Sequence, residues 1–307
     1  MKYWWVNQNQ TYKFEVKGGF LWSPITNSNG TRNPFYDYMK EVSVGDIVFS
    51  FYGTRIQALG VVQKQATLAP KPNFESAGSY WLNEGWYVEV EFESIKNPFR
   101  PKEYIEILRD FLPEKYSPLQ QNGNGNQKIY LTTIPENLAK KIIEIANIPI
   151  VDIQNELAPA PNSESDYEIE LEVKTKFIDG DLDRIQLVKS RKGQGVFKSN
   201  VRLIEDHCRV TGVSNVRHLI ASHIKPWRNS DNEEKLDGYN GLLLSPHVDH
   251  LFNYGFISFQ NSGKLIISKE LNPEVLDAWA ISRTFDAGEF KYNHFKYLEF
   301  HRAEILK

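Results

Sequence analysis

Residues 218–255 carry side chains whose types and spacing suit the cleavage of a phosphodiester. His223 ends an apolar run just before a proline turn, and Asn240 follows seventeen residues later at the start of a second apolar run. Asp249 and Asn253 are four residues apart, so a helix would place them on one face. Histidine titrates near neutrality and can act as a general base. Carboxylate and amide oxygens suit a hard divalent cation such as Mg²⁺.

Three local elements must bring these side chains together. The apolar runs HLIASH and NGLLLS predict the two strands of a hairpin, and PHVDHLFNYG predicts a helix after them. A hairpin followed by a helix is how a ββα-metal unit is built. Taken singly, His223, Asn240 and Asp249 would each fit a capped hairpin without catalysis. Their combined spacing favours the catalytic interpretation.

A longer pattern extends this constellation over residues 208–268. It reads C-x-x-T-G, S-H-I-x-P-W, N-G-L-L-L-S and D-x-x-F-N-x-G, and the RKGQGVF element lies just upstream. This pattern resembles the HNH endonuclease family. The resemblance implies that His223 is the general base and that Asp249 holds the place of the last metal ligand. It also implies that Asn240 hydrogen-bonds across the loop that holds His223 and sets its ring orientation.

One position departs from that family. Many members carry an acidic residue or a histidine directly before the general base, where it binds the metal, and here that residue is Ser222. Either Ser222 is a weak ligand or water fills the position. His247 and His250 are possible substitutes, although an isolated histidine is more often a packing residue. Cys208 is the only cysteine, which excludes an internal disulfide, and we expect it to be a buried structural thiol.

Charge is distributed unevenly along the chain. The net charge is −3, whereas residues 173–230 contain twelve Lys or Arg and five Asp or Glu, a local balance of +7. A positive field suits a polyanionic partner, although a solvated surface would explain it equally well. This basic region contains a glycine turn, which a plain connecting loop would also explain. The candidate phosphate contacts in the turn are Arg191, Lys192 and Gln194.

The first 150 residues read mainly as strands. The segments rich in β-branched and aromatic residues are 2–8, 45–52, 56–63 and 85–95. Two helices with proline in the first turn are predicted at 101–112 and 135–147. We therefore predict an α+β protein: a small barrel-like domain at 1–150, a linker at 151–168 and a nuclease domain at 169–307. Within 181–206 we expect helices on either side of the glycine turn at 190–195.

Aromatic residues are concentrated in the first domain. The segments GGFLWSPITNSNGTRNPFYDYM (18–39) and VGDIVFSFYGTRIQALGVV (44–62), with YWWVN before them, resemble the EVE branch of the PUA-like superfamily, related to YTH readers of methylated adenine. WVNQNQ replaces the Lys-Ser-Glu-Pro that opens the EVE pattern. The resemblance implies a PUA-like β-barrel with an aromatic pocket that holds one flipped, modified base.

Several residues are candidates for contacts to that base. Trp22 and Ser23 come first, from their match to the YTH-like segment. The second group comprises Asn33, Phe51, Tyr52, Trp81 and Trp86. Any single tryptophan is as readily an ordinary core residue. Seven tryptophans in the chain, most of them in this domain, make it improbable that all are core.

Together the two resemblances imply a modification-dependent restriction endonuclease of EVE-HNH type. It would flip 5-methylcytosine or 5-hydroxymethylcytosine out of double-stranded DNA and cut nearby with Mg²⁺ or Mn²⁺, in defence against phage. One HNH site cuts one strand, so we expect a homodimer. The alternatives are an inactive reader of modified nucleic acid, suggested by Ser222, and an HNH nuclease directed at RNA. The absence of a signal peptide and of a long apolar run predicts a cytoplasmic protein with no membrane partner.

Overall fold

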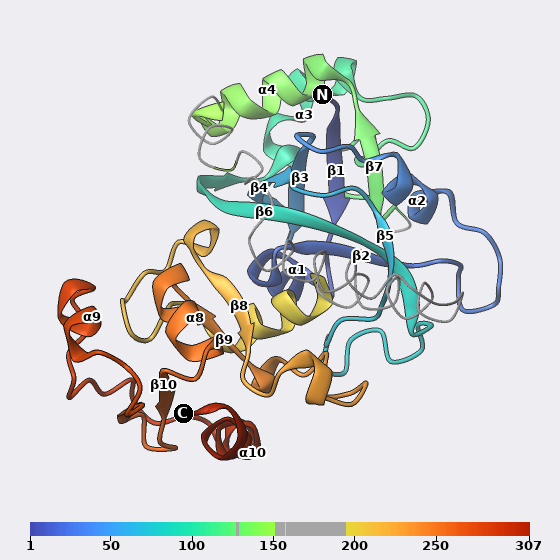
Figure 1. Cartoon of the computed structure of the whole chain (residues 1–307). Helices are drawn as coiled ribbons and strands as arrows, with labels where there is room; N and C mark the ends of the chain where they lie inside the picture. Colours follow the sequence, from blue (N-terminus) through green and yellow to red (C-terminus); the bar gives the residue numbers. More distant parts are fainter. Residues whose placement is uncertain (127–128, 151–156, 158–194) are drawn as a thin grey trace. The chain divides into compact units, whose positions relative to one another are not determined.

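The computed structural model describes residues 1–126, 129–150, 157 and 195–307. The chain divides into two compact units, Met1–Pro161 and Asn162–Lys307 (Figure 1). The predicted linker at 151–168 lies outside the described residues except for Leu157. Among the described helices, none has both the length and the apolar character needed to span a membrane.

The first unit is built on a curled, seven-stranded sheet (Figure 1). The strand order is β2-β6-β4-β3-β1-β7, and β5 also pairs with β6. Only the neighbours β1 and β3 run parallel; the other pairs in this sheet are antiparallel. The strands are β1 (Tyr3–Asn7), β2 (Phe20–Pro24), β3 (Ile47–Tyr52), β4 (Arg55–Val62), β5 (Thr67–Pro70), β6 (Glu84–Phe99) and β7 (Leu131–Ile134). The four predicted strands are confirmed as β1, β3, β4 and β6.

Both faces of the sheet are covered, which explains why its strands are apolar on both sides. Trp5 packs into one core together with Ile142 of a helix, whereas its neighbour Trp4 packs into the other core. Side chains alternate between the faces of a strand, so the Trp-Trp pair supplies both cores. The helices are α1 (Tyr12–Gly18), α2 (Pro34–Asp37), α3 (Ile105–Leu108) and α4 (Glu136–Ala146), and the 3₁₀ turns are η1 (Tyr38–Glu41), η2 (Pro101–Tyr104) and η3 (Arg109–Phe111).

The two helix predictions in this unit fare differently. The helix at 135–147 is confirmed as α4, which buries Leu138 and Ile142 and ends at Asn147 in the left-handed conformation. The continuous helix at 101–112 is wrong, because η2, α3 and η3 divide that segment. Tyr104 leaves helical geometry at φ −118°, and its ring packs edge-on to Phe99 at 5.6 Å. A tertiary contact overrides the local preference here.

The second unit contains the predicted hairpin and helix. β8 (Ile220–His223) pairs antiparallel with β9 (Gly241–Leu244), and α8 (Pro246–Asn253) follows directly. The ββα arrangement and the α+β class are therefore confirmed. A helix over 195–204 precedes the hairpin, in agreement with part of the predicted 181–206 helices. The other elements are η4 (Val216–His218), η5 (Trp227–Asn229), η6 (Gly238–Asn240), β10 (Ile257–Phe259), β11 (Leu265–Ile267), α9 (Pro273–Ala278), η7 (Tyr292–His294), α10 (Phe295–Phe300) and a π-helical turn η8 (His301–Ile305).

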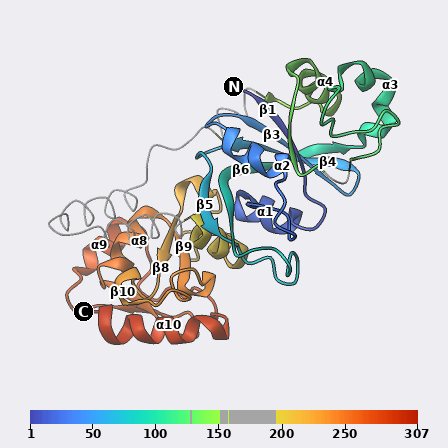
Figure 2. The same ribbon diagram turned by 90° about the vertical axis from the view of Figure 1, so that its right-hand side faces the viewer.

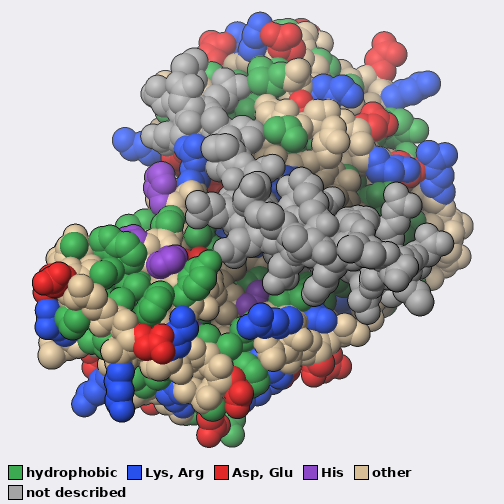
Figure 3. Space-filling view, in the orientation of Figure 1, with side chains coloured by type: hydrophobic (Ala, Val, Ile, Leu, Met, Phe, Trp, Pro, Cys, Tyr) green, Lys and Arg blue, Asp and Glu red, His purple; other side chains and the backbone are tan. Residues whose placement is uncertain are grey.

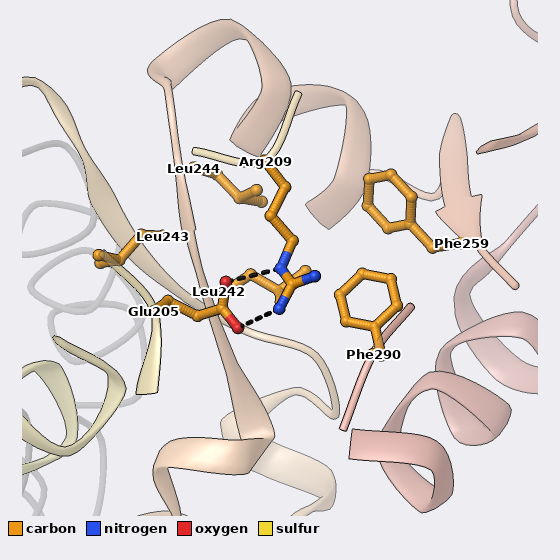
Figure 4. A pocket seen from close by; sticks show the side chains of 7 residues that line it. All are labelled: Glu205, Arg209, Leu242, Leu243, Leu244, Phe259 and Phe290. Carbon is orange, nitrogen blue, oxygen red and sulfur yellow. Dashed lines mark hydrogen bonds and ion pairs between the residues drawn. The ribbon is translucent and has the colours of Figure 1, made fainter. Parts of the chain in front are cut away.

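Packing within this unit joins segments that are distant in sequence. The Arg209 guanidinium makes two hydrogen bonds to the Glu205 carboxylate, at 2.7 and 2.8 Å, and lies 4.6 Å from the centre of the Phe290 ring (Figure 4). α10 continues into the π-helical turn as one rod (Figure 2). His301 of that turn stacks on Phe252 of α8. The His301–Phe252 contact fixes α8 against the C-terminal turn.

Candidate functional site

The imidazole of His223 is held by three neighbours. His223 is the last residue of β8, and its Nε2 lies 3.1 Å from the carbonyl oxygen of Lys235. The ring stacks face to face on Phe197, with centroids 3.5 Å apart and 8° between the planes. Trp227 approaches edge-on at 5.6 Å. The ring is therefore fixed in both its position and its plane.

The stacking depends on a glycine in the opposite strand. Gly241 pairs with His223 in the hairpin register. A Cβ atom on Gly241 would lie 2.4 Å from Val201 and 2.7 Å from Phe197 of the 195–204 helix. Only glycine lets that helix approach closely enough for the Phe197 ring to lie under the imidazole.

The His223 imidazole is uncharged at neutral pH. Burial lowers its pKa to about 4, and the hydrogen bond to Lys235 opposes this only in part. Because a carbonyl can only accept, Nε2 carries the proton of the neutral ring. Nδ1 then carries the lone pair, and it has no hydrogen-bond partner among the residues that the structure describes. That nitrogen can accept a proton.

Asn240 fastens the loop that follows His223. Its Oδ1 accepts from the backbone N–H of Lys225 at 2.8 Å. Its Nδ2 lies 3.2 Å from the Lys225 carbonyl, 3.2 Å from Ser230 Oγ and 3.0 Å from the Glu234 carbonyl. The residue after Glu234 supplies the carbonyl that binds the imidazole. The expected hydrogen bonds across the loop are present, and they reach His223 through the backbone rather than directly.

Three of the predicted metal ligands form a hydrogen-bonded chain. Ser222 Oγ donates to Asn253 Oδ1 at 3.2 Å, and Asn253 Nδ2 donates to Asp249 Oδ1 at 2.8 Å. Ser222 is the residue before His223 on β8, so the chain begins one residue from the candidate base in the sequence. It offers one carboxylate, one amide oxygen and one hydroxyl. These hard oxygen donors fit Mg²⁺ or Mn²⁺ with water and phosphate in the remaining positions.

The two histidines of α8, His247 and His250, belong to an aromatic cluster. The His247 ring lies 5.6 Å from Trp279, and the His250 ring lies 4.7 Å from Tyr254 and 6.3 Å from Trp279. In the view of Figure 3, histidine and hydrophobic side chains lie next to each other on part of the second unit. Within the described residues, no three His, Cys, Asp or Glu gather as a metal-binding group. The structure thus brings Asp249 together with Asn253 and Ser222, and surrounds His250 with aromatic rings.

Two further sequence predictions concern this unit. Cys208 is fully buried, as expected of a structural thiol. The candidate phosphate contacts Arg191, Lys192 and Gln194 lie outside the described residues. Phe197, Lys235 and Trp227, which hold the imidazole, were not among the predicted site residues. Phe197 ends the RKGQGVF element, which was the one signal that could have found it.

The predicted base-contact residues of the first unit lie on two faces of the sheet. Ser23 of β2 pairs with Trp86 of β6, so their side chains share one face. Trp22 faces the other way, where it packs against Trp81 at 6.0 Å and Phe74 at 5.9 Å. Ser23 and Trp86 are therefore together, and Trp22 and Trp81 form a separate pair.

The indole nitrogens of this unit differ in their bonding. Trp4 Nε1 donates to Asp46 at 2.9 Å, and Trp5 Nε1 donates to Asn7 at 2.9 Å. In contrast, Trp86 Nε1 is buried and has no hydrogen-bond partner among the described residues, and the same holds for Trp22 Nε1 and Ser23 Oγ. A buried polar atom without a partner costs about 1–3 kcal/mol. The unpartnered Ser23 and Trp86 atoms on one face mark a place where a polar ligand would be stabilised.

The remaining candidates lie elsewhere. Asn33 caps α2, where its Oδ1 accepts from the Phe35 N–H at 3.0 Å. Phe51 is in a core, and Tyr52 stacks on Tyr12 at 4.5 Å. Phe51 pairs with Ile56 of β4, and Ile56 pairs with Phe99, the last residue of β6. Trp86 lies at the other end of β6. Phe51 and Tyr52 are thus not brought together with the Ser23 pair.

Comparison with known proteins finds a family match within the second unit. Residues 208–260 match the family model described as HNH endonuclease. That range contains His223, Asn240, Asp249 and Asn253. No match to this chain was found among curated proteins.

Solved structures resemble about half of the chain. Rpa0253 from Rhodopseudomonas palustris has 13% identity and a TM-score of 0.33, and the match covers 48% of this chain and 95% of that chain. The DUF55 domain of human thymocyte nuclear protein 1 has 15% identity and a TM-score of 0.35, covering 48% and 99%. Human THYN1 in complex with DNA containing 5-methylcytosine has 14% identity and a TM-score of 0.32, covering 48% and 98%.

Proposed function

Since residues 208–260 match the HNH endonuclease family, we propose that this protein is a modification-dependent DNA endonuclease. The observation that carries the proposal is that one ββα unit holds both the fixed imidazole of His223 and the chain of Ser222, Asn253 and Asp249 oxygens. Phosphodiester hydrolysis requires a base and a set of hard oxygen donors for a cation.

Each of these side chains has a distinct role. His223 Nδ1 takes the proton from the attacking water, while Phe197 and the Lys235 carbonyl keep the ring in place. Asp249 and Asn253 hold a divalent cation, Mg²⁺ or Mn²⁺. When bound, the cation supplies positive charge to the phosphate and to the departing 3′-oxygen. The products are 5′-phosphate and 3′-hydroxyl ends.

The first unit selects the DNA. Ser23 Oγ and Trp86 Nε1 receive the polar edge of a modified cytosine that has left the duplex, and the Trp86 indole offers a stacking surface. Extrusion of a base costs a few kcal/mol, and aromatic stacking returns about 1–3 kcal/mol. The modified bases are 5-methylcytosine and 5-hydroxymethylcytosine, as the EVE resemblance implies.

The biological role follows from this selectivity. The enzyme acts in the cytoplasm on double-stranded DNA that carries modified cytosine, such as phage DNA. Because one site cuts one strand, two chains act together as a homodimer on the DNA. The residues Arg191, Lys192 and Gln194 contribute phosphate contacts in this proposal.

The test is cleavage of one DNA sequence in three forms, with cytosine, 5-methylcytosine or 5-hydroxymethylcytosine, in the presence of Mg²⁺ or Mn²⁺. We expect the modified forms to be cut and His223→Ala to abolish cutting while binding persists. His207→Ala is the matched control, because His207 is exposed and lies outside the site. Equal cutting of all forms would refute the selectivity.

Two other outcomes identify the rival functions. No cleavage by the wild type with any divalent metal, together with selective binding, would make the protein an inactive reader. Cleavage of an RNA of the same sequence in preference to DNA would make it an RNA nuclease.

A further inference from the structure

Loop 71–83, between β5 and β6, lies at the same end of β6 as the Ser23–Trp86 pair. β6 begins at Glu84, and Trp86 is its third residue. The loop presents two large apolar side chains to solvent, Tyr80 at 65% exposure and Leu82 at 51%. Exposed apolar side chains next to a candidate binding pocket indicate a contact surface.

Contacts among the residues of the loop and with β2 hold loop 71–83 in place. Trp81, between the two exposed side chains, turns inward and packs against Trp22 at 6.0 Å. Its ring lies so close to Gly78 (φ +61°) that a Cβ atom there would meet it at 2.0 Å. Lys71 Nζ donates to the Gly78 carbonyl at 3.0 Å, and the Trp81 N–H donates to the same carbonyl at 2.9 Å. Tyr80 therefore projects from a pre-ordered loop.

Tyr80 also faces the segment that follows β2. The pKa of Tyr36 in α2 is raised, mainly by burial. A hydrogen bond with Asn33 lowers this pKa, and the neighbouring Tyr80 hydroxyl raises it further. The two hydroxyls must be close for this effect. Tyr36 packs in turn against Tyr130 at 6.4 Å, and the Tyr130 hydroxyl lies 3.1 Å from the Trp22 backbone N–H. Tyr80 thus lies near Tyr36, and its neighbour Trp81 packs on Trp22, the residue before Ser23 on β2.

We propose that Tyr80 is a wedge that enters the DNA stack and fills the gap left by the extruded base. This inference rests on the proposed function. An extruded base leaves a space of one ring between its neighbours, and an aromatic side chain can restack both of them. The ordered loop presents the ring without further loss of conformational freedom. The partner of this surface is a base-paired duplex, because a single strand offers no gap to fill.

The test compares two forms of the same DNA strand. A labelled oligonucleotide with one 5-methylcytosine is bound to the full chain in EDTA, once as a duplex and once as a single strand. We expect Tyr80→Ala to weaken duplex binding about tenfold or more and to change single-strand binding less than about twofold, since that base is already unstacked. Tyr80→Phe should retain duplex affinity because it keeps the ring.

The controls separate the wedge from the pocket. Tyr292→Ala removes an exposed tyrosine of the second unit and should leave both affinities unchanged. Thermal melting of each variant confirms folding. If Tyr80→Ala weakens binding of the duplex and of the single strand equally, or weakens neither, the wedge is refuted. The proposed recognition of the modified base would not be affected by that result. If the wild type fails to distinguish the modified duplex from an unmodified one, the proposed function itself fails.

Discussion

His223 and Phe197 are stacked with their ring centres 3.5 Å apart, although twenty-five residues separate them in the chain. Phe197 is 3% exposed and belongs to the core of the second unit. The same contact therefore does two things: it excludes water from one face of the imidazole, which lowers the pKa, and it fixes the plane of the ring. Phe197 therefore positions the ring of His223, the candidate base.

Replacement of Phe197 by leucine tests this positioning role. Leucine keeps an apolar side chain of related volume, at a cost of under about 1.5 kcal/mol in folding. It cannot lie flat against the imidazole, so we expect kcat to fall about ten- to a hundredfold. KM and the Mg²⁺ concentration for half-maximal rate should stay near the wild-type values, because Phe197 contacts neither DNA nor the candidate metal ligands.

Val201→Ala provides the matched control for that variant. Val201 lies on the same helix, is fully buried and does not stack on the imidazole. The Val201→Ala substitution should lower the free energy of unfolding without a comparable loss of kcat. A Phe197→Leu enzyme with wild-type kcat, or a Val201→Ala enzyme equally impaired, would contradict the positioning role.

The stability of the second unit should decrease as pH falls from about 6.5 to 4. His301 is 1% exposed, and its ring bonds to Ser258 Oγ and to the Phe252 carbonyl, both at 3.0 Å. Burial lowers its pKa to about 4. The unfolded chain, with an ordinary histidine pKa near 6.5, binds the proton first, so stability is lost as pH falls through this window. The loss can reach about 3 kcal/mol.

Hydrogen exchange of peptides from α8 and α10 at pH 7 and pH 4.5 measures this loss. His301→Gln should reduce the pH dependence in part, because His223 and His294 of the same unit also have lowered pKa values and still titrate. The exposed His207→Gln serves as the control and should keep it. An unchanged dependence in His301→Gln would show that another group is responsible.

Ser222→Asp should increase the affinity for the metal. Ser222 is buried and hydrogen-bonds to Asn253, so a carboxylate there would lie next to the other candidate ligands. A second negative ligand should lower the Mg²⁺ concentration for half-maximal cleavage about tenfold. Without metal the buried carboxylate is unpaired, and the melting temperature should fall and recover on addition of Mg²⁺.

Ser222→Ala completes that experiment. If the hydroxyl is a ligand, its loss should raise the metal requirement; if water fills the position, the requirement should hardly change. An unaltered Mg²⁺ requirement in Ser222→Asp would place the ion away from Ser222 and would remove the chain from Ser222 to Asp249 as the cation site.

The sequence predicted the ββα elements well, because they are local. Two apolar runs and a four-residue spacing suffice to place His223, Asn240 and Asp249 on a hairpin and a helix. The contacts that hold the imidazole could not be read in the same way. Phe197 and Lys235 meet His223 through tertiary packing, and only the glycine at 241 permits the approach of Phe197. Spacing gives no information on such contacts.

The base pocket shows a different limit. Trp22 and Ser23 are neighbours in sequence and were predicted to act together, yet adjacent side chains of a strand point to opposite faces. Because β2 was not predicted as a strand, the sequence did not indicate that Trp22 and Ser23 point to opposite faces. The partner of Ser23 is Trp86, on a strand sixty residues away, and only the sheet register brings them together.

The last prediction concerns the two unpartnered atoms of that pair. Trp86→Phe removes the indole N–H and keeps an aromatic ring, and Ser23→Ala removes the hydroxyl. Since neither atom has a partner among the described residues, their loss should leave the free energy of unfolding unchanged or raise it by about 1 kcal/mol. Binding of the modified duplex should instead weaken about tenfold, because in the proposed complex each atom bonds the base.

Trp4→Phe gives the opposite pattern and serves as the control. Trp4 Nε1 donates to Asp46, so its removal leaves a buried acceptor and should destabilise the protein by about 1–3 kcal/mol. Selectivity for modified DNA should persist in the folded fraction, since the Trp4 indole nitrogen already bonds Asp46 and is not free for a ligand. Denaturation curves and fluorescence anisotropy measure both quantities. If Trp86→Phe instead loses stability and keeps its selectivity, the Trp86 nitrogen is structural and the base must bind elsewhere on this unit.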